Sequence, residues 1–419
     1  MTENGLADIL IPGPRTHEPA GDLISRALRA IRFHLGMEVA YVSEMVGGQS
    51  VFRHVDAPGL EDIVAVGDAR ALDDVYCRHI LEGRLPELMP DTADVPLAAG
   101  MPITAAVPIG AHISVPLIMP DGRRYGMFCC LSRHPHSSLN ERDLGLMRAV
   151  GDLVAHEIHL ANERDRVEAA ARRRVESVLD GGVIGIVYQP IWSIESGRPV
   201  GAEALARFPT DVHASPDLWF REAADLGLGV QLEMAAIEQA FALFHRLPPD
   251  IYLTLNASPE TIMSADLRAF LEGKRLDRIV IEVTEHASVA NYDDLVASTV
   301  ELRRRGMRIA VDDAGAGYAS LSHILSLQPE IIKLDTDLTR GVQNDHARQA
   351  LTTALVDFGR RTGARIIAEG VETAGEYEML RSLGVRHVQG HHIGRPVSGD
   401  AFLRLLDGHP PGAPDTSEG

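Results

Sequence analysis

Cysteine is scarce in this chain, which contains only Cys77, Cys129 and Cys130 among its 419 residues. Three cysteines are too few for the disulfide framework that stabilises small secreted domains. The first residues also lack the basic start and the apolar stretch of a secretory signal peptide. We therefore expect a reducing, cytoplasmic location.

Long apolar runs and excess positive charge are missing as well. No stretch of about 18 apolar residues occurs, so the sequence contains no candidate transmembrane helix. The formal net charge is −19, which disfavours non-specific binding to nucleic acid or to an anionic membrane. A phosphate-containing substrate would need locally bound cations to offset this charge. Hydrophobic residues make up 45% of the chain, enough for more than one sizeable core.

The chain divides into two patterned regions joined by a charged segment. Residues 1–19 contain three prolines and are expected to form a loose leader. Residues 20–161 combine a leading helical pattern, several strand-like runs and a closing helix, for which Glu141 is the expected capping residue. Residues 162–180 are charged and alanine-rich and precede two glycines, which predicts a helical linker with a glycine stop.

Residues 181–409 show a different pattern, in which short β-rich runs alternate with helix-length segments. Eight such alternations predict an α/β barrel. The runs are 184–191, 201–208, 252–258, 279–285, 308–315, 330–335, 365–372 and 385–390.

Each run begins with apolar residues and ends with a polar one. The C-terminal ends of barrel strands converge on one face, where active sites lie. Carboxylates crowded there repel one another unless cations neutralise them, and oxygen ligands favour Mg²⁺ or Mn²⁺ over zinc. The residues at these ends are Gln189, Glu203, Asn256, Glu282, Glu285, Asp312, Asp313, Lys333, Glu369 and Gln389.

Taken singly, these residues have ordinary structural explanations. One acid after a strand is usually a helix cap or a solvated loop residue, and a single lysine is usually on the surface. Asp312 and Asp313 could be turn residues before Gly315. Their joint occurrence at successive strand ends favours a metal site instead, in which the aspartate pair could bridge two ions about 3.5–4 Å apart.

Residues 180–405 resemble the EAL family of cyclic di-GMP phosphodiesterases over essentially the whole family domain. The resemblance implies a modified (β/α)₈ barrel and admits a first strand that is antiparallel to the rest. It is carried by YQPI (188–191), EALAR (203–207), the Asn of TLNAS (256), EVTE (282–285), DDAGAGYASL (312–321), KLD (333–335), AEGVET (368–373) and QGHHIGRP (389–396).

The resemblance also implies a role for each site residue. Two divalent cations, Mg²⁺ or Mn²⁺, would activate a water that opens one phosphodiester bond and yields linear pGpG. The first cation would be held by Glu203, Asn256, Glu282 and Asp312, and the second by Asp312, Asp313 and Glu369. Lys333 would act at the attacking water or the phosphate, Arg207 would grip a phosphate, Gln189 and Gln389 would contact substrate in the cavity, and Glu285 would pin the loop at 313–320.

This loop departs from the family pattern. Ala314, Ala316 and Ala319 stand where the family usually has phenylalanine, threonine or serine, and serine, whereas Gly315, Gly317 and Tyr318 are retained. Because every charged ligand is present, the departure concerns loop stiffness, and hence rate and regulation, more than catalysis itself.

Residues 20–161 resemble a GAF domain, a small-molecule or signal-sensing α/β fold, mainly through segments 76–91 and 113–132. The ligand of this domain cannot be read from the sequence. Cys77 and His79 leave two interpretations open: a chromophore or redox site, or a cysteine that is simply a small buried hydrophobe.

A chain with these motifs could have one of three functions. The first is a phosphodiesterase regulated by the front domain and acting as a homodimer. The second is an inactive EAL domain that serves as a cyclic di-GMP receptor or protein-docking module; inactive relatives typically lose metal ligands, which are retained here. The third, a combined cyclase and hydrolase, needs a GGDEF-like turn that this sequence does not contain.

Overall fold

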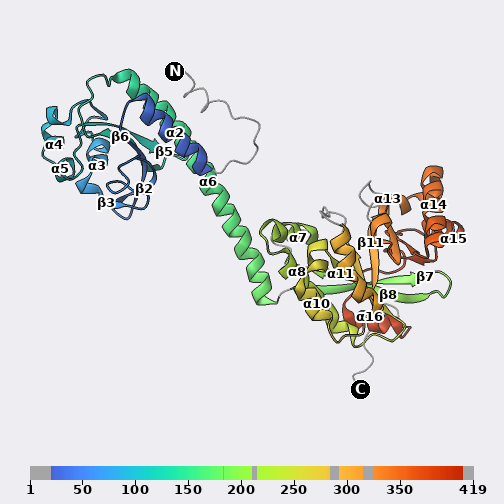
Figure 1. The fold of residues 1–419 in the computed structure, drawn as a ribbon. Coiled ribbons are helices and arrows are strands. Elements are labelled where there is room, and N and C mark those ends of the chain that lie inside the picture. Colours follow the sequence, from blue (N-terminus) through green and yellow to red (C-terminus); the bar gives the residue numbers. More distant parts are fainter. Residues whose placement is uncertain (1–19, 183, 210–214, 284–291, 315–323, 409–419) are drawn as a thin grey trace. The chain divides into compact units, whose positions relative to one another are not determined.

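The computed structural model describes residues 20–182, 184–209, 215–283, 292–314 and 324–408. The chain forms two compact units, and the division between them falls between Glu168 and Ala169 (Figure 1). The leader at 1–19, Glu285 and loop residues 315–319 lie outside the described residues. No described helix is both long and apolar enough to span a bilayer.

The first unit is built on an antiparallel sheet with the strand order β3-β2-β1-β6-β5-β4. Its strands are β1 (Val39–Val46), β2 (Gln49–Asp56), β3 (Ala69–Ala71), β4 (Leu88–Met89), β5 (Ala111–Ile118) and β6 (Arg124–Ser132). Side chains alternate between the two faces of a strand, so this sheet supports two apolar layers. Helices α2 (Ala20–His34) and α6 (Glu141–Gly181) pack on one face. The other face is covered by α3 (Tyr76–Leu81), α4 (Pro96–Ala99) and α5 (Pro102–Ala106), and the short helices η1 (Leu72–Asp74) and η2 (Thr92–Asp94) lie in the connecting segments.

The three cysteines are free and buried in this unit. Cys130 faces the α2 and α6 layer, whereas Cys129, its neighbour in β6, faces the opposite layer together with Cys77 of α3. The adjacent cysteines therefore point to opposite faces of the sheet, as the alternation of side chains along a strand requires. Cys77 is only 2% exposed, as expected for a buried hydrophobe.

Helix α6 continues without a break through the segment predicted to be a helical linker. Its cap differs from the prediction: Asn140 Oδ1 accepts from the Arg142 amide at 2.9 Å, and Asp143, not Glu141, accepts from the Asn140 amide at 3.0 Å. The helix ends at Gly181, and Gly182 adopts φ 61°, a left-handed conformation that favours glycine. Val175 and Val178 are buried with Trp219, so the last turns belong to the core of the second unit.

The second unit is a closed barrel with the strand order β10-β11-β12-β13-β14-β7-β8-β9. The eight predicted runs correspond to β7 (Gly185–Ser193), β8 (Arg198–Arg207), β9 (Tyr252–Ala257), β10 (Ile279–Val283), β11 (Arg308–Ala314), β12 (Ile331–Leu334), β13 (Arg365–Ala368) and β14 (His387–Val388). The first strand, β7, is antiparallel to both of its neighbours, and the remaining pairs are parallel. The expected modified (β/α)₈ barrel is therefore confirmed.

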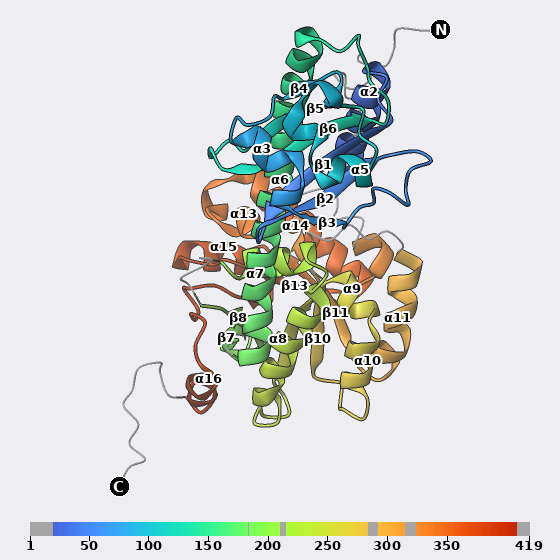
Figure 2. The same cartoon turned by 90° about the vertical axis from the view of Figure 1, so that its left-hand side faces the viewer.

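Helices surround the strands of this barrel (Figure 2). They are α7 (Pro216–Asp225), α8 (Gly229–Phe244), α9 (Pro259–Met263), α10 (Ala265–Leu271), α11 (Tyr292–Arg304), α13 (Thr336–Thr339), η3 (Val342–Asn344), α14 (His346–Thr362), α15 (Ala374–Ser382) and α16 (Gly399–Leu406). Outward-facing strand residues form the main core with these helices, whereas a smaller apolar layer fills the barrel interior.

Candidate active site

The site residues form the layer of side chains next to the apolar layer inside the barrel. That layer includes Val280, Ala310, Ile331 and Ile367. Two residues further along the same chain segments come Glu282, Asp312, Lys333 and Glu369. Because inward positions recur every second residue in a strand, the polar residues form the next inward layer. The period of the strand therefore explains why these side chains meet.

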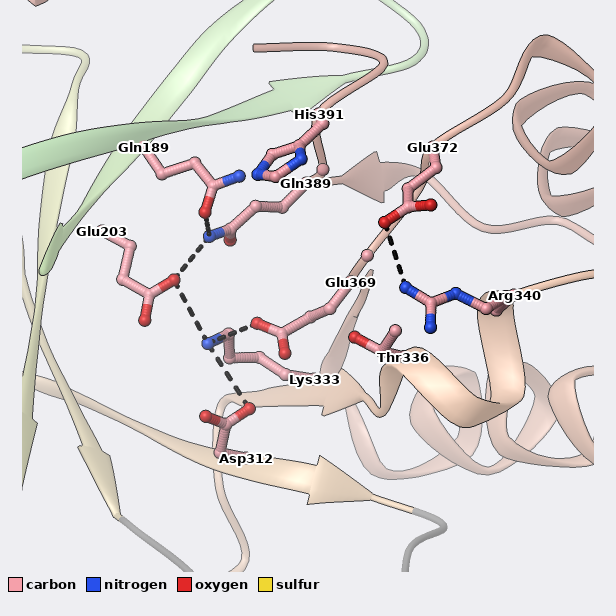
Figure 3. Close-up of a pocket in the computed structure, with 12 residues that line it drawn as sticks. Gln189, Glu203, Asp312, Lys333, Thr336, Arg340, Glu369, Glu372, Gln389 and His391 are labelled. Atoms are coloured by element: carbon pink, nitrogen blue, oxygen red, sulfur yellow. Dashed lines mark hydrogen bonds and ion pairs between the residues drawn. The ribbon is translucent and has the colours of Figure 1, made fainter. Parts of the chain in front are cut away.

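A cavity of about 250 Å³ opens over this polar layer (Figure 3). It is lined by Gln189, Glu203, Asp312, Lys333, Thr336, Arg340, Glu369, Gly370, Glu372, Gln389, Gly390 and His391. Six of these residues were predicted from the strand ends: Gln189, Glu203, Asp312, Lys333, Glu369 and Gln389.

Lys333 stands at the centre of the cluster, with a side chain that is 2% exposed. Its Nζ lies 3.5 Å from Glu203 Oε2 and 3.4 Å from Asp312 Oδ1. It also forms ion pairs with Glu282 and Glu369. Four carboxylates thus share one buried ammonium group, so the cluster carries more negative charge than its own lysine can balance.

The pKa values of the cluster reflect this crowding. Burial raises the pKa of Glu282 and Glu369 well above the ordinary range; Lys333 opposes the rise and the neighbouring carboxylates add to it. Burial also disfavours the ammonium group of Lys333, but the surrounding carboxylates outweigh that effect and raise its pKa well above the ordinary value. Lys333 is therefore held in its charged form.

Amide side chains orient Glu203. Asn256 Nδ2 donates to Glu203 Oε1 at 3.3 Å, and Gln389 Nε2 donates to Glu203 Oε2. Gln389 Nε2 also donates to Gln189 Oε1 at 3.1 Å, so β7, β8 and β14 are joined by one polar network. Two residues after Asn256, the Ser258 amide donates to Glu233 of α8 at 2.7 Å, and this hydrogen bond fixes the turn after β9.

The aspartate pair lies on an irregular stretch of β11. The pairing of β11 with β12 shifts between Val311 and Ala314, and Asp313 has φ 52°. A non-glycine residue in this region costs about 1–2 kcal/mol and is found mainly where surrounding structure enforces it. Because the bulge breaks the alternation of side chains, Asp313 need not face away from Asp312. The Asp313 amide donates to Asp312 Oδ1 at 2.9 Å.

The donor set suits divalent cations. Oxygen atoms of Glu282, Asp312 and Glu369 lie within 4.8 Å of one another. Glu282 Oε2 is buried and has no hydrogen-bond partner among the residues described. A buried carboxylate oxygen without a partner is costly, and coordination of a hard cation removes that cost. The residues present therefore fit a site for Mg²⁺ or Mn²⁺.

Five predicted residues do not line the cavity. Asn256, Glu282 and Asp313 are bonded to residues that do line it, whereas Arg207 and Glu285 have no described contact with it. Arg207 lies four positions beyond Glu203 on the same face of β8, roughly 13 Å further along the strand. Its side chain is exposed and donates to the Ala206 carbonyl at 2.8 Å, so its role in gripping phosphate stays a prediction. Glu285 lies outside the described residues, and its role is likewise untested.

Four lining side chains were not singled out from the sequence: Thr336, Arg340, Glu372 and His391. Glu372 and His391 lie within motifs that carry the family resemblance, which was a signal to consider them. Arg340 follows α13, well beyond the end of β12, so the rule of polar strand ends could not find it. Gly370 has φ 62°, and a Cβ there would come within 2.5 Å of Thr336 Oγ1, so only glycine fits this turn at the cavity.

Comparison with known proteins agrees with this architecture. Residues 172–396 match the model of the EAL domain, and residues 17–159 match a model of the GAF domain. An uncharacterised protein of Synechocystis is 30% identical over 51% of this chain and 32% of its own length. The probable cyclic di-GMP phosphodiesterase PdeD of Escherichia coli is 27% identical over 53% of this chain and 43% of its own length. The chain thus spans less than half the length of these two relatives.

Among solved structures, the PaMucR phosphodiesterase in complex with cyclic di-GMP is 26% identical. The similarity covers 56% of this chain and 99% of that chain, with a TM-score of 0.51. The strand order, the polar layer above the apolar one and these matches lead to one conclusion: the chain belongs to the EAL-domain family and carries a GAF domain on its N-terminal side.

Proposed function

We propose that this chain hydrolyses one phosphodiester bond of cyclic di-GMP to give linear pGpG, using two divalent cations at the mouth of the barrel. The observation that carries the proposal is the gathering of four carboxylates around Lys333 on one face of the barrel. The named activity of PdeD and the ligand of the PaMucR structure support this choice of substrate.

When bound, the two cations would acidify a water molecule and offset negative charge on the phosphate. Their proposed ligands are Glu203, Asn256, Glu282 and Asp312 for the first, and Asp312, Asp313 and Glu369 for the second. Lys333 would hold its positive charge beside the reacting phosphate, where charge grows in the transition state. The water oxygen forms a bond to phosphorus, the bond to the 3′-oxygen breaks, and that oxygen takes up a proton.

The decisive experiment incubates the purified full chain with cyclic di-GMP and Mn²⁺ or Mg²⁺ and follows pGpG by chromatography. We expect turnover with either cation and none with excess EDTA. Turnover that persists in EDTA would contradict the two-cation mechanism. Tight binding of cyclic di-GMP without any product would instead identify an inactive receptor or docking module.

We also propose that residues 20–161 form a sensor domain that regulates a catalytic domain at 181–409, and that the chain acts as a homodimer. The support is helix α6, which continues through residues 162–180 and ends in buried contacts of Val175 and Val178. A continuous helix transmits a change of orientation better than a flexible tether does. A passive spacer is the competing explanation.

Coupling can be tested by comparing the full chain with a fragment covering residues 165–409, which keeps Val175 and Val178. Under the proposal, specific activity rises with protein concentration as dimers form, and the two proteins differ. Equal activity in both, constant over a wide concentration range, would reject the coupling.

A further inference from the structure

The cavity contains a second cationic side chain besides Lys333. Arg340 lines the cavity, and its side chain is 57% exposed. Figure 3 shows Arg340 beyond Thr336, on the opposite side of the cavity from Gln189 and Glu203. Lys333 is already shared by four carboxylates, whereas among the residues that the structure describes Arg340 pairs with a single acid, Glu372, at 3.0 Å.

The backbone on both sides of this pair is held by one buried carboxylate. Glu376, which is 3% exposed, accepts hydrogen bonds from the backbone amides of Gly341, Glu372 and Thr373 at 2.8–2.9 Å. Gly341 directly follows Arg340, so the segment after β12 and the segment after β13 are fixed to each other. Arg348 adds a further hydrogen bond to the Arg340 carbonyl. Arg340 is thus presented at the cavity on a rigid base.

The ion pair itself contributes little to stability. Both side chains are about half exposed, and ion pairs of this kind are typically worth about 0–1 kcal/mol. Because Glu372 holds Arg340 only weakly in water, an incoming anion can share or replace it. A guanidinium group donates two parallel hydrogen bonds to a phosphate, which makes it better suited to this task than an ammonium group.

We propose that Arg340 binds the second phosphate of the substrate, the one that is not cleaved. This inference rests on the proposed function. A cyclic dinucleotide carries two phosphodiester groups, and only one can occupy the carboxylate cluster at a time. The other needs its own countercharge in a protein with a formal net charge of −19. Arg340 therefore selects a substrate with two phosphates over a simple diester with one.

The test compares Arg340→Ala and Arg340→Lys with the wild-type full chain on cyclic di-GMP and on bis(p-nitrophenyl) phosphate, a diester with one phosphate. Arg361→Ala is the matched control, since Arg361 is an exposed arginine paired with Asp357 at 2.8 Å away from the cavity. Loss of one charge-assisted hydrogen bond predicts a rise of about ten- to a hundredfold in KM for cyclic di-GMP in Arg340→Ala. The change in kcat should be smaller, and Arg340→Lys should lie between alanine and wild type.

On the one-phosphate diester, the loss of kcat/KM should be at least fivefold smaller than the loss on cyclic di-GMP, and Arg361→Ala should match wild type on both. Equal losses on both substrates, or a fall in kcat with unchanged KM, would overturn the proposal. If the wild-type chain binds cyclic di-GMP without hydrolysing it, the proposed function fails, and the same comparison is made on Kd by calorimetry. A Kd unchanged in Arg340→Ala would then reject Arg340 as a phosphate ligand, and a raised Kd would support it.

Discussion

Replacing Lys333 by methionine removes the charge at the centre of the polar cluster while keeping most of the side-chain volume. Without a bound cation, Glu203, Glu282, Asp312 and Glu369 would then face one another with no internal countercharge. We expect a large loss of stability in the metal-free protein and a much smaller loss when Mn²⁺ is present, because the cation replaces the missing charge.

The expected loss of stability can be estimated from the burial of the charged side chains. The side chain of Lys333 is 2% exposed and that of Glu282 is fully buried, so solvent screens their interaction poorly. Removing one partner of a buried ion pair costs about 3–5 kcal/mol. For a unit of this size, about 1 kcal/mol shifts Tm by about 2–4 °C, which predicts a fall of roughly 6–20 °C in EDTA. Glu282 and Glu369, whose pKa values are already raised, would take up protons and so lose their negative charge. The expected fall in Tm therefore lies toward the lower end of this range.

The assay is thermal unfolding of the barrel followed by tryptophan fluorescence, since Trp192 and Trp219, the only tryptophans of the chain, both lie in that unit. Lys274→Met is the matched control, because Lys274 is the other lysine and contacts Phe270 outside the cavity. Kinetics on the same variant should show a fall in kcat that exceeds any rise in KM. A metal-free Tm within about 2 °C of wild type would refute the idea that Lys333 balances the carboxylates.

Two further predictions concern the carboxylate cluster and the first unit. Glu203→Gln should lower kcat by at least about a hundredfold, since a proposed ligand of the first cation is lost. Activity within tenfold of wild type in the chromatographic assay would show that Glu203 does not belong to the active site. Burial lowers the pKa of His112 to about 3, below the value of about 6.5 in an unfolded chain. The unfolded state therefore takes up this proton first as the pH falls, and this one residue should lower the stability of the first unit by about 2 kcal/mol between pH 7.5 and pH 5. His112→Phe should reduce that loss, measured by hydrogen exchange of β5 and β6 amides; an identical loss in the variant would contradict it.

The barrel could be predicted because its signals are local. Each strand is a short apolar run that ends in a polar residue, and the eight runs each correspond to a strand of the structure. The convergence of Asp312, Lys333 and Glu369 follows from the rule that the parallel strands of a barrel end on one face, whereas Glu203 joins them from within β8. The antiparallel direction of β7 could be anticipated only from the family resemblance, because nothing in the sequence of a single strand specifies its direction.

Other features depend on contacts between distant segments. Nothing near Glu376 in the sequence indicates that its carboxylate holds both the turn after Arg340 and the turn at Glu372. Arg340 itself looks like an ordinary exposed arginine until β12 and β13 are placed side by side. The capping prediction for Glu141 was wrong for a different, local reason: an acid at either of two nearby positions suits a helix start, and backbone geometry selected Asp143.

Which residues face inward could be predicted from the sequence, because side chains alternate along a strand and the order of apolar and polar residues is known. The barrel fold and the residue types of the polar layer follow from this pattern. How the charges of that layer are arranged depends on the tertiary structure. One buried lysine is shared by four carboxylates, the aspartate pair lies on a bulge, and Arg340 lines the cavity beside Glu372. Such balances depend on distances between residues far apart in the chain, and electrostatic energy depends on those distances and on burial, not on sequence order.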